Sequence, residues 1–444
     1  MHIAQKTAES LNFYYGWVIV GVAVLSMSFW FGIRSSFSVF YVALLEEFPW
    51  NRAESAGVQS LVMICYSVTA PLAGMLIDRF GPRRVIVPGI FILTLGLTLT
   101  SAMQHLAHFY MFYGLIVGVG STAIGIVSYS AIMAHWFEKK RGLASGIAVS
   151  GMGLGIFLLV PFCQEMINVW GWRLTFLSLG VLSLLFLWPA NGLLLLHKPQ
   201  DILQQVDGND FKTNFPDDIS RQNGRLNPDV ALTLKQILSS ARFWFLMTFP
   251  FLCIMAVYII LVHSMKFMVD QGIDKMTASF LFALLGATSC VFRIFWGWLS
   301  DHLGRERSYT LGMLFACAGV AALLILEMTH RLGFAVVFSL LFGIGWGVAA
   351  PMIMSSAADL FKGRFFGLIC GTVEGGIGVG GAFGAWIGGW FFDKTQSYRL
   401  AFFLAIAVLM VSCIFIWLAA PGKNRIGLKH QTASANAHGG SNDN

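Results

Sequence analysis

The stretch GMLIDRFGPRR at residues 74–84 places one acid and three arginines at the end of a long apolar run. A related stretch, GWLSDHLGRER at residues 297–307, begins 223 residues later, which is about half of the 444-residue chain. The first Gly, the Asp and the second Gly keep their spacing in both copies. A repeat of this length on an apolar background predicts a membrane protein built from two related halves.

The composition of the chain also indicates a membrane protein. Hydrophobic residues make up 57% of the chain and charged residues 11%, whereas a globular domain carries about 25% charged residues. A net charge of +7 would suggest nucleic acid as a partner of a soluble protein, but the basic residues here lie in short loops between apolar segments. We therefore expect a lipid bilayer and no nucleic acid as partner. The seven cysteines show no CxxC pair, and we expect no metal and no cofactor.

Twelve apolar segments are long enough to cross a bilayer, which takes about 20 helical residues. They predict an all-α membrane protein with twelve transmembrane helices in two pseudo-symmetric six-helix bundles. The predicted domains are an N-terminal bundle (1–197), a polar cytoplasmic linker (198–240), a C-terminal bundle (241–420) and a disordered cytoplasmic tail (421–444). A short surface helix is expected within the linker at Leu232–Ser239. The segments are 15–43, 54–77, 84–103, 109–134, 142–168, 174–196, 241–266, 277–300, 309–327, 332–358, 366–391 and 399–419.

Lysine and arginine predict the orientation of the chain in the membrane. With a cytoplasmic N-terminus, 20 of the 29 basic residues fall on the cytoplasmic side and 7 on the outer side. Arg34 and Arg293 remain inside the membrane. Because basic loops stay in the cytoplasm, we expect a multi-pass protein of the cell membrane (inner or plasma) with both termini cytoplasmic.

The two copies of the repeated motif resemble the loop signature of the major facilitator superfamily, G-x-x-x-D-R-x-G-R-R, which joins the second and third helices of each half. The second copy has His302 where the signature has Arg. A further stretch, FEKKRGLASGIAVSGMGLG at residues 137–155, resembles the monocarboxylate transporter signature, [YF]-F-x-K-R-R-x-L-A-x-G-x-A-x-A-G-x-x-x-G, with Lys140 for an Arg and Ser150 for an Ala. The chain thus resembles the branch of monocarboxylate transporters and oxalate–formate antiporters.

The two arginines inside the predicted helices are the leading candidates for a substrate site. A charge in hydrocarbon costs about 2.5–3.5 kcal/mol on insertion scales, so such residues usually serve function. Arg34 shares a helical face with Trp30 and Ser38. The monocarboxylate resemblance implies that Arg293 binds the substrate carboxylate. The predicted substrate-binding residues are Arg293, Arg34, Ser38, Tyr258 and Ser121; other polar residues of the helices are expected to be packing residues, namely Gln59, Tyr66, Tyr129 and His263.

Glu374 is the predicted proton-coupling residue. The family that the chain resembles often has an Asp one turn before the substrate arginine, but Ser289 stands there in this sequence. Glu374 lies at a depth similar to that of Arg293, so we expect the two to pair when the site is empty. Substrate would displace Glu374, which would then take up a proton. The alternative is that Glu374 braces its glycine-rich helix and that transport is exchange or uniport.

Two further patterns concern helix ends and helix packing. The charged residues of the repeated motif are predicted to hold cytoplasmic helix ends together as a conformational latch, the alternative being that they only set topology. They are Asp78, Arg79, Arg83, Arg84, Asp301 and Arg305. Glycines that recur every four or five residues predict close packing of the fifth and eleventh helices at the contact between the halves. They are Gly142, Gly146, Gly151, Gly155, Gly371, Gly375, Gly376, Gly380, Gly384 and Gly388.

No catalytic constellation is visible in the sequence, which lacks a nucleophile elbow, an HExxH and a phosphate loop, so we predict a transporter rather than an enzyme. The best interpretation is a secondary active transporter of small, monocarboxylate-like organic anions, which moves substrate with protons by alternating access and functions as a monomer. One alternative is an organic anion exchanger of oxalate–formate type, with a counter-anion in place of protons. A drug-exporting antiporter would favour buried acids over buried arginines, and a membrane receptor would usually carry a signalling domain.

Overall fold

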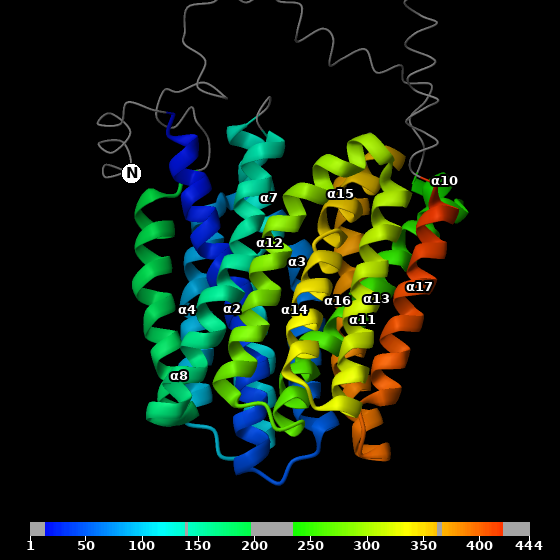
Figure 1. Cartoon of the computed structure of the whole chain (residues 1–444). Coiled ribbons are helices and arrows are strands. Elements are labelled where there is room, and N and C mark those ends of the chain that lie inside the picture. The colour runs from blue at the N-terminus through cyan, green and yellow to red at the C-terminus, as the bar shows by residue number, and fades with distance from the viewer. Residues whose placement is uncertain (1–13, 138–140, 197–233, 362–365, 421–444) are drawn as a thin grey trace, which may run out of the picture.

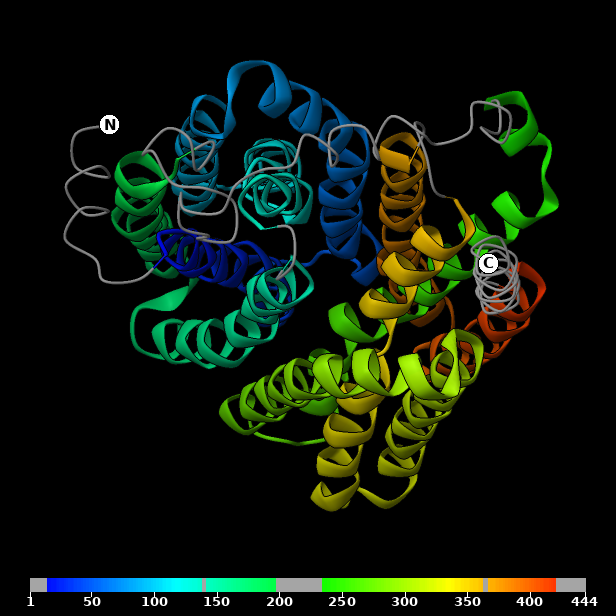
Figure 2. The same cartoon turned by 90° about the horizontal axis from the view of Figure 1, so that it is seen from above.

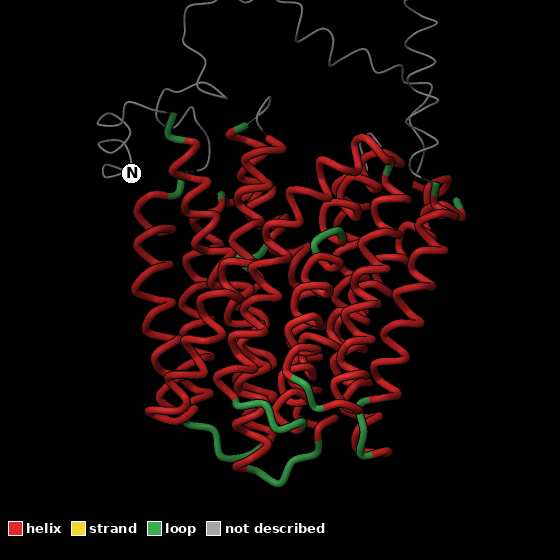
Figure 3. Tube along the Cα trace, viewed as in Figure 1, coloured by secondary structure: helices red, strands yellow, loops and turns green. Residues whose placement is uncertain are grey.

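Long apolar helices make up almost all of the structure, which is a computed structural model (Figure 1, Figure 3). It describes residues 14–137, 141–196, 234–361 and 366–420, and no strand occurs among them. In a bilayer each backbone N–H and C=O group needs a partner within the protein, and a helix provides these partners within one segment. The predicted all-α class is confirmed.

The helices that precede residue 197 form one group, which we call the N-terminal helices (Figure 2). The longest of them, α8, is interrupted at Gly171, where φ is 76° and ψ is 167°. Because glycine tolerates positive φ, the chain turns back at this residue, and α8 crosses the protein twice. The N-terminal helices are α2 (Gly16–Glu47), α3 (Arg52–Phe80), α4 (Pro82–Ser101), α5 (Leu106–Phe109), η1 (Tyr110–Val117), α6 (Gly118–Thr122), α7 (Ile126–Trp136), α8 (Arg141–Pro189) and η2 (Ala190–Leu194).

The helices that follow residue 233 lie beside the first group and are called the C-terminal helices (Figure 2). They begin with the short α10, which falls within the expected surface helix at Leu232–Ser239. The C-terminal helices are α10 (Leu234–Ser239), α11 (Ala241–Asp270), α12 (Lys275–Leu303), α13 (Arg305–Thr329), α14 (Leu332–Trp346), α15 (Ala349–Leu360), α16 (Phe366–Thr395) and α17 (Arg399–Ala419). The rest of the predicted linker, residues 198–233, and the predicted tail lie outside the described residues.

Ten helices in the described ranges are long and apolar enough to cross a membrane. One of them, Leu143–Leu194, contains the turn at Gly171 and therefore corresponds to two predicted segments. Helix α16 is not among the ten, yet it runs for 30 residues beside α3 and α11. With these two adjustments, each predicted segment has a helical counterpart.

The second glycine of the repeated motif has the same structural role in both copies. Gly81 ends α3 with φ 84°, and Gly304 ends α12 with φ 92°. Residues with a side chain rarely adopt such values. Each glycine lets the chain leave one long helix and enter the next within a single residue. The repeat thus marks the same tight corner in each group of helices.

Three helix pairs form the main contact between the two groups: α3 with α16, α8 with α12, and α2 with α11. Glycine allows a close approach at two of these pairs. A Cβ atom at Gly286 would press on Ile156 of α8, and one at Gly378 would lie 2.9 Å from the Met63 carbonyl oxygen of α3. Small residues therefore bring the backbones together where the groups meet.

The predicted role of the regularly spaced glycines is wrong in one respect. A Cβ atom at Gly151 or Gly155 would clash with carbonyl oxygens of α2, and one at Gly380 or Gly384 with carbonyl oxygens of α11. Both series thus pack helices of the same group. The contact between the groups uses the glycines in between, such as Gly153 and Gly378, because residues one or two positions apart point to different sides of a helix.

Candidate functional site

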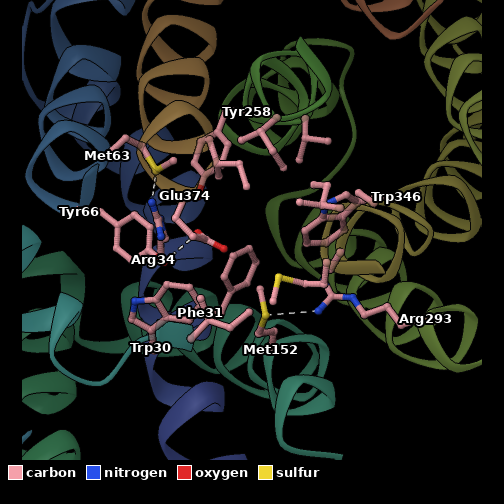
Figure 4. A pocket seen from close by; sticks show the side chains of 18 residues that line it. Trp30, Phe31, Arg34, Met63, Tyr66, Met152, Tyr258, Arg293, Trp346 and Glu374 are labelled. Atoms are coloured by element: carbon pink, nitrogen blue, oxygen red, sulfur yellow. Dashed lines mark hydrogen bonds between the residues drawn. The ribbon is translucent and has the colours of Figure 1, made fainter. Parts of the chain in front are cut away.

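A cavity between the two groups of helices contains the three ionisable residues that the sequence singled out (Figure 4). Arg34 comes from α2, Arg293 from α12 and Glu374 from α16. The cavity measures about 710 Å³, including space open to solvent. Aromatic and aliphatic side chains form most of the remaining lining: Trp30, Phe31, Met63, Tyr66, Ile126, Met152, Ile254, Val257, Tyr258, Trp346, Ala349, Ala350, Ile353, Met354 and Ile377.

Three aromatic rings surround the guanidinium group of Arg34. Its central carbon lies 5.5 Å from the ring centroid of Trp30, 5.2 Å from that of Tyr66 and 5.4 Å from that of Tyr258. A cation near an aromatic face is attracted to the ring quadrupole, and more strongly when it is desolvated. An Nη atom of Arg34 also contacts the sulfur of Met63. Arg34 is therefore held firmly on one side of the cavity.

Glu374 belongs to the same side of the cavity as Arg34. The Tyr66 hydroxyl donates a hydrogen bond of 3.2 Å to Glu374 Oε2, and Arg34 acts electrostatically on both groups. We call Arg34, Tyr66 and Glu374 the charge cluster. It joins α2 and α3 of the N-terminal helices to α16 of the C-terminal helices.

Arg293 lies on the opposite side of the cavity (Figure 4). It is only 7% exposed, and its guanidinium carbon lies 5.1 Å from the ring centroid of Trp346. Its Nη1 atom donates weakly to the Val149 carbonyl oxygen at 3.5 Å and to the Met152 sulfur at 3.3 Å, while Nε has no hydrogen-bond partner. Within the part of the chain that the structure describes, no carboxylate forms an ion pair with Arg293.

The expected pair between Glu374 and Arg293 is wrong for this conformation. Glu374 interacts with Tyr66 and Arg34, whereas Arg293 reaches across to α8 of the other group. The position of each residue in its apolar segment indicates its depth in the membrane but not the direction in which its side chain points. Arg34, on α2, is the arginine that lies on the same side of the cavity as Glu374 (Figure 4).

The other predicted substrate residues differ in their position. Tyr258 lines the cavity and packs on Arg34. Ser38 lines a smaller void, to which Arg34 and Gln59 also contribute, and donates to the Ser35 carbonyl oxygen at 2.9 Å. Ser121 lies outside both spaces, and its hydroxyl donates to the Gly118 carbonyl oxygen of its own helix at 3.0 Å. It therefore does not face the space in which a substrate would bind.

Several residues of the cavity were not predicted from the sequence. Tyr66 was interpreted as a packing residue, but it donates to Glu374. Phe31 and Trp346 lie with their rings 5.7 Å apart on the cavity wall. In a chain with 39 Phe and 14 Trp, nothing in the composition around these two distinguishes them from core or lipid-facing residues. The one available signal was the helical spacing from Arg34.

The latch residues of the second motif copy connect helix ends within the C-terminal helices. Arg305, at the start of α13, pairs with Asp301 at 3.1 Å and with Asp359 at the end of α15 at 3.2 Å. In the first copy, Arg79 and Arg84 are exposed and Arg83 is half-buried. The side chain of Asp78 lies outside the described part of the structure.

The two groups of helices are joined by ion pairs at the end of the molecule opposite the described chain ends (Figure 1). Arg52 Nη1 lies 2.6 Å from Asp270 Oδ2, and Lys275 Nζ lies 2.5 Å from Glu46 Oε2. The carboxylate of Asp393 accepts hydrogen bonds from the backbone N–H groups of Arg52 (3.0 Å) and Ala53 (2.8 Å). We call these interactions the end contact.

Asp393 of α16 thus caps the first turn of α3 from the other group of helices. Carboxylates at this position neutralise free N–H groups and the positive end of the helix dipole. Tyr398 completes the end contact by accepting a hydrogen bond of 2.8 Å from Arg52. Burial raises the pKa of Tyr398 to about 12, so this hydroxyl stays neutral at physiological pH.

Comparisons with known proteins agree with this architecture. The family model of the Major Facilitator Superfamily matches residues 18–369. The chain belongs to the major facilitator superfamily. Among solved structures, this superfamily member resembles a bacterial homolog to the human lysosomal transporter Spinster, in an inward-facing and occupied conformation. The TM-score is 0.69 at 14% identity, over 92% of this chain and 98% of that chain. At this identity the likeness shows the fold alone.

The similar sequences narrow the resemblance within the superfamily. The chain is 28% identical over 400 residues to monocarboxylate transporter 13 of Bos taurus. The aligned region covers 89% of this chain and 87% of the relative. It is 24% identical over 416 residues to monocarboxylate transporter 2 of Homo sapiens, with 90% and 84% covered. The resemblance to monocarboxylate transporters that the stretch at residues 137–155 suggested is thereby confirmed over nearly the whole chain.

Proposed function

We propose that this protein is a secondary active transporter of small organic anions that binds the substrate carboxylate at Arg293, between the two groups of helices. The observation that carries the proposal is the state of Arg293, which is buried, faces a cavity and pairs with no carboxylate in the described structure. Its Nε has no hydrogen-bond partner. A carboxylate can satisfy such a guanidinium with two parallel charge-assisted hydrogen bonds.

The position of Arg293 also supports alternating access. It extends from α12 to the Val149 carbonyl oxygen and the Met152 sulfur of α8. A substrate bound to Arg293 would therefore contact both groups of helices at once. Binding at this junction lets the ligand favour one arrangement of the two groups over another.

The end contact defines the conformation that we propose. The positive-inside rule places the loops around residues 48–51 and 271–274 outside the cell, which is the side that the end contact closes. The structure then represents a state that is closed to the outside, with both termini in the cytoplasm. Release of the end contact would begin the change to the outward-open state.

The charge cluster supports proton coupling through Glu374. Two arginines and one carboxylate give the empty cavity a formal charge of +1. An anionic substrate on Arg293 brings this charge to zero, and a proton on Glu374 Oε1 restores it while Tyr66 keeps its hydrogen bond to Oε2. Substrate and proton together therefore leave the electrostatics of the cavity as they were when it was empty. In the alternative, anion exchange, Glu374 stays ionised and serves only to hold Arg34.

Transport of labelled acids into proteoliposomes tests the proposed function. Each acid, such as pyruvate or phenylpyruvate, is compared with its uncharged amide, with and without a pH gradient that is acidic on the side of addition. We expect saturable uptake of acids, none of the amides, and faster uptake with the gradient. Equal uptake of acid and amide would contradict a carboxylate site, and gradient-independent accumulation would favour exchange.

A further inference from the structure

The lining of the cavity is unusually apolar for a site that binds a small hydrated anion. Its charged residues are Arg34, Arg293 and Glu374, and its other polar groups are the hydroxyls of two tyrosines and the indole N–H groups of Trp30 and Trp346. One of these, Tyr66, already donates to Glu374. A small hydroxy acid or keto acid on Arg293 would find few partners for its remaining oxygen, and an unpaired buried polar group lowers affinity.

An aromatic surface begins directly at Arg293. The Trp346 ring lies under its guanidinium group, and the Phe31 ring lies 5.7 Å from Trp346 at an angle of 31°. In the close view Phe31 extends between the two arginines (Figure 4). A flat apolar group attached to a carboxylate on Arg293 could pack against both rings at centroid distances that aromatic pairs favour.

The charge cluster argues against a second carboxylate on the substrate. Arg34 already has Glu374 as its anionic neighbour and is enclosed by three aromatic rings. A dicarboxylate that bridged Arg34 and Arg293 would place its second charge beside Glu374, and like charges in a low-dielectric site repel strongly. One arginine is therefore available to the substrate, and the surface next to it is apolar.

On the basis of the proposed function, we infer that the preferred substrate is a monocarboxylate with an aromatic or similarly large apolar body. Its carboxylate binds Arg293, and its body packs on Trp346 and Phe31. Each additional buried methylene group gives about a tenfold or greater preference in an apolar pocket. We therefore expect kcat/KM for phenylpyruvate to exceed that for pyruvate by about tenfold or more.

The experiment measures uptake by the full chain in proteoliposomes for matched pairs of acids: pyruvate with phenylpyruvate, and lactate with 3-phenyllactate. Succinate is included as a dicarboxylate and 2-phenylethanol as an aromatic compound without a carboxylate. A clear preference for both phenyl acids supports the inference. Equal or better transport of pyruvate and lactate, or of succinate, would overturn it and leave the proposed function intact. If no acid is transported and none competes, the proposed function itself fails.

Variants of the aromatic surface locate the preference. Trp346→Leu and Phe31→Leu should each lower the ratio of phenylpyruvate to pyruvate uptake by about fivefold or more. Trp298→Leu on α12 is the matched control, because Trp298 is 59% exposed on the outer surface of its helix, and its ratio should stay at the wild-type value. If one variant fails to fold, the other still tests the surface. An unchanged ratio in a folded Trp346→Leu or Phe31→Leu protein would contradict the proposed packing.

Discussion

Arg34 and Arg293 are two arginines in one cavity with opposite surroundings. Arg34 is enclosed by three aromatic rings and has an acidic neighbour, Glu374. Arg293 has one ring beneath it and two weak contacts to α8, and Glu374 does not pair with it; the Nε atoms of both arginines lack a hydrogen-bond partner. Both are buried, so burial alone does not separate them. What separates them is whether the protein itself supplies the compensating anion.

This difference suggests how a transporter can keep two cations within the membrane for different purposes. A buried charge with a partner from the protein costs less and stabilises the contact between helices, whereas a buried charge without one is stabilised when a ligand binds. Binding of a carboxylate would therefore stabilise the Arg293 guanidinium group relative to its state in the empty site. The predictions below test this contrast, from the largest expected effect to the smallest.

The first prediction is that Arg293→Lys removes most transport, whereas Arg34→Lys retains more. Lysine keeps the positive charge but cannot form the two parallel hydrogen bonds to a carboxylate. A charge-assisted hydrogen bond contributes about 1.5–3 kcal/mol, so uptake at low substrate should fall roughly 10- to 100-fold. Initial uptake rates in proteoliposomes measure the effect, with Arg331→Lys, at an exposed loop position, as control. Wild-type uptake by a folded Arg293→Lys protein would contradict the assignment of carboxylate binding to Arg293.

The second prediction concerns proton coupling. Glu374→Gln keeps an acceptor for the Tyr66 hydroxyl but cannot gain or lose a proton. We expect the variant to lose the acceleration of uptake that an acidic outside pH gives to wild type, while exchange of labelled for unlabelled acid continues. Uptake is measured at several outside pH values with a fixed internal pH. A variant that still accumulates substrate on a proton gradient would assign coupling to another group.

The third prediction compares the partners of Glu374. In double-mutant cycles of thermal stability in detergent, Arg34→Met and Glu374→Gln should be coupled by about 1–3 kcal/mol, because either change alone leaves a buried charge without its partner. Arg293→Met and Glu374→Gln should be nearly additive, within about 0.5 kcal/mol. A larger coupling in the Arg293 cycle would restore the pairing that was first expected from the sequence.

The sequence predicted those features that depend on the spacing along one helix. Apolar length identified the membrane helices, the 223-residue repeat identified two related groups, and the cost of burying charge identified Arg34, Arg293 and Glu374 as site residues. The structure places all three in one cavity. Each of these inferences needs only the position of a residue along the chain, which also sets its depth in the membrane.

Features that depend on the rotation of helices against one another could not be predicted in this way. The pairing of Glu374 was assigned to Arg293 because the two have similar depth, but three helices contribute to the charge cluster, and their rotation is set by packing. The same reason explains why the glycine series was assigned to the wrong contact. It also explains why Ser121, which is satisfied within its own helix, appeared to be a site residue.

The last prediction turns to the end contact and has the smallest expected effect. Asp393→Ala removes the carboxylate that accepts from Arg52 N and Ala53 N, and loss of such a cap typically costs about 1 kcal/mol. If the end contact closes the outer side, this amount should shift the population toward the outward-open state by about fivefold. A cysteine at Ser38, in a background without the native cysteines, should then react correspondingly faster with a membrane-impermeant thiol reagent added outside. Glu165→Ala, at another exposed acid, is the control and should leave the rate unchanged. Because the carboxylate of Asp393 is contributed by α16 to α3, an unchanged rate in Asp393→Ala would mean that this cap stabilises α3 without holding the two groups of helices together.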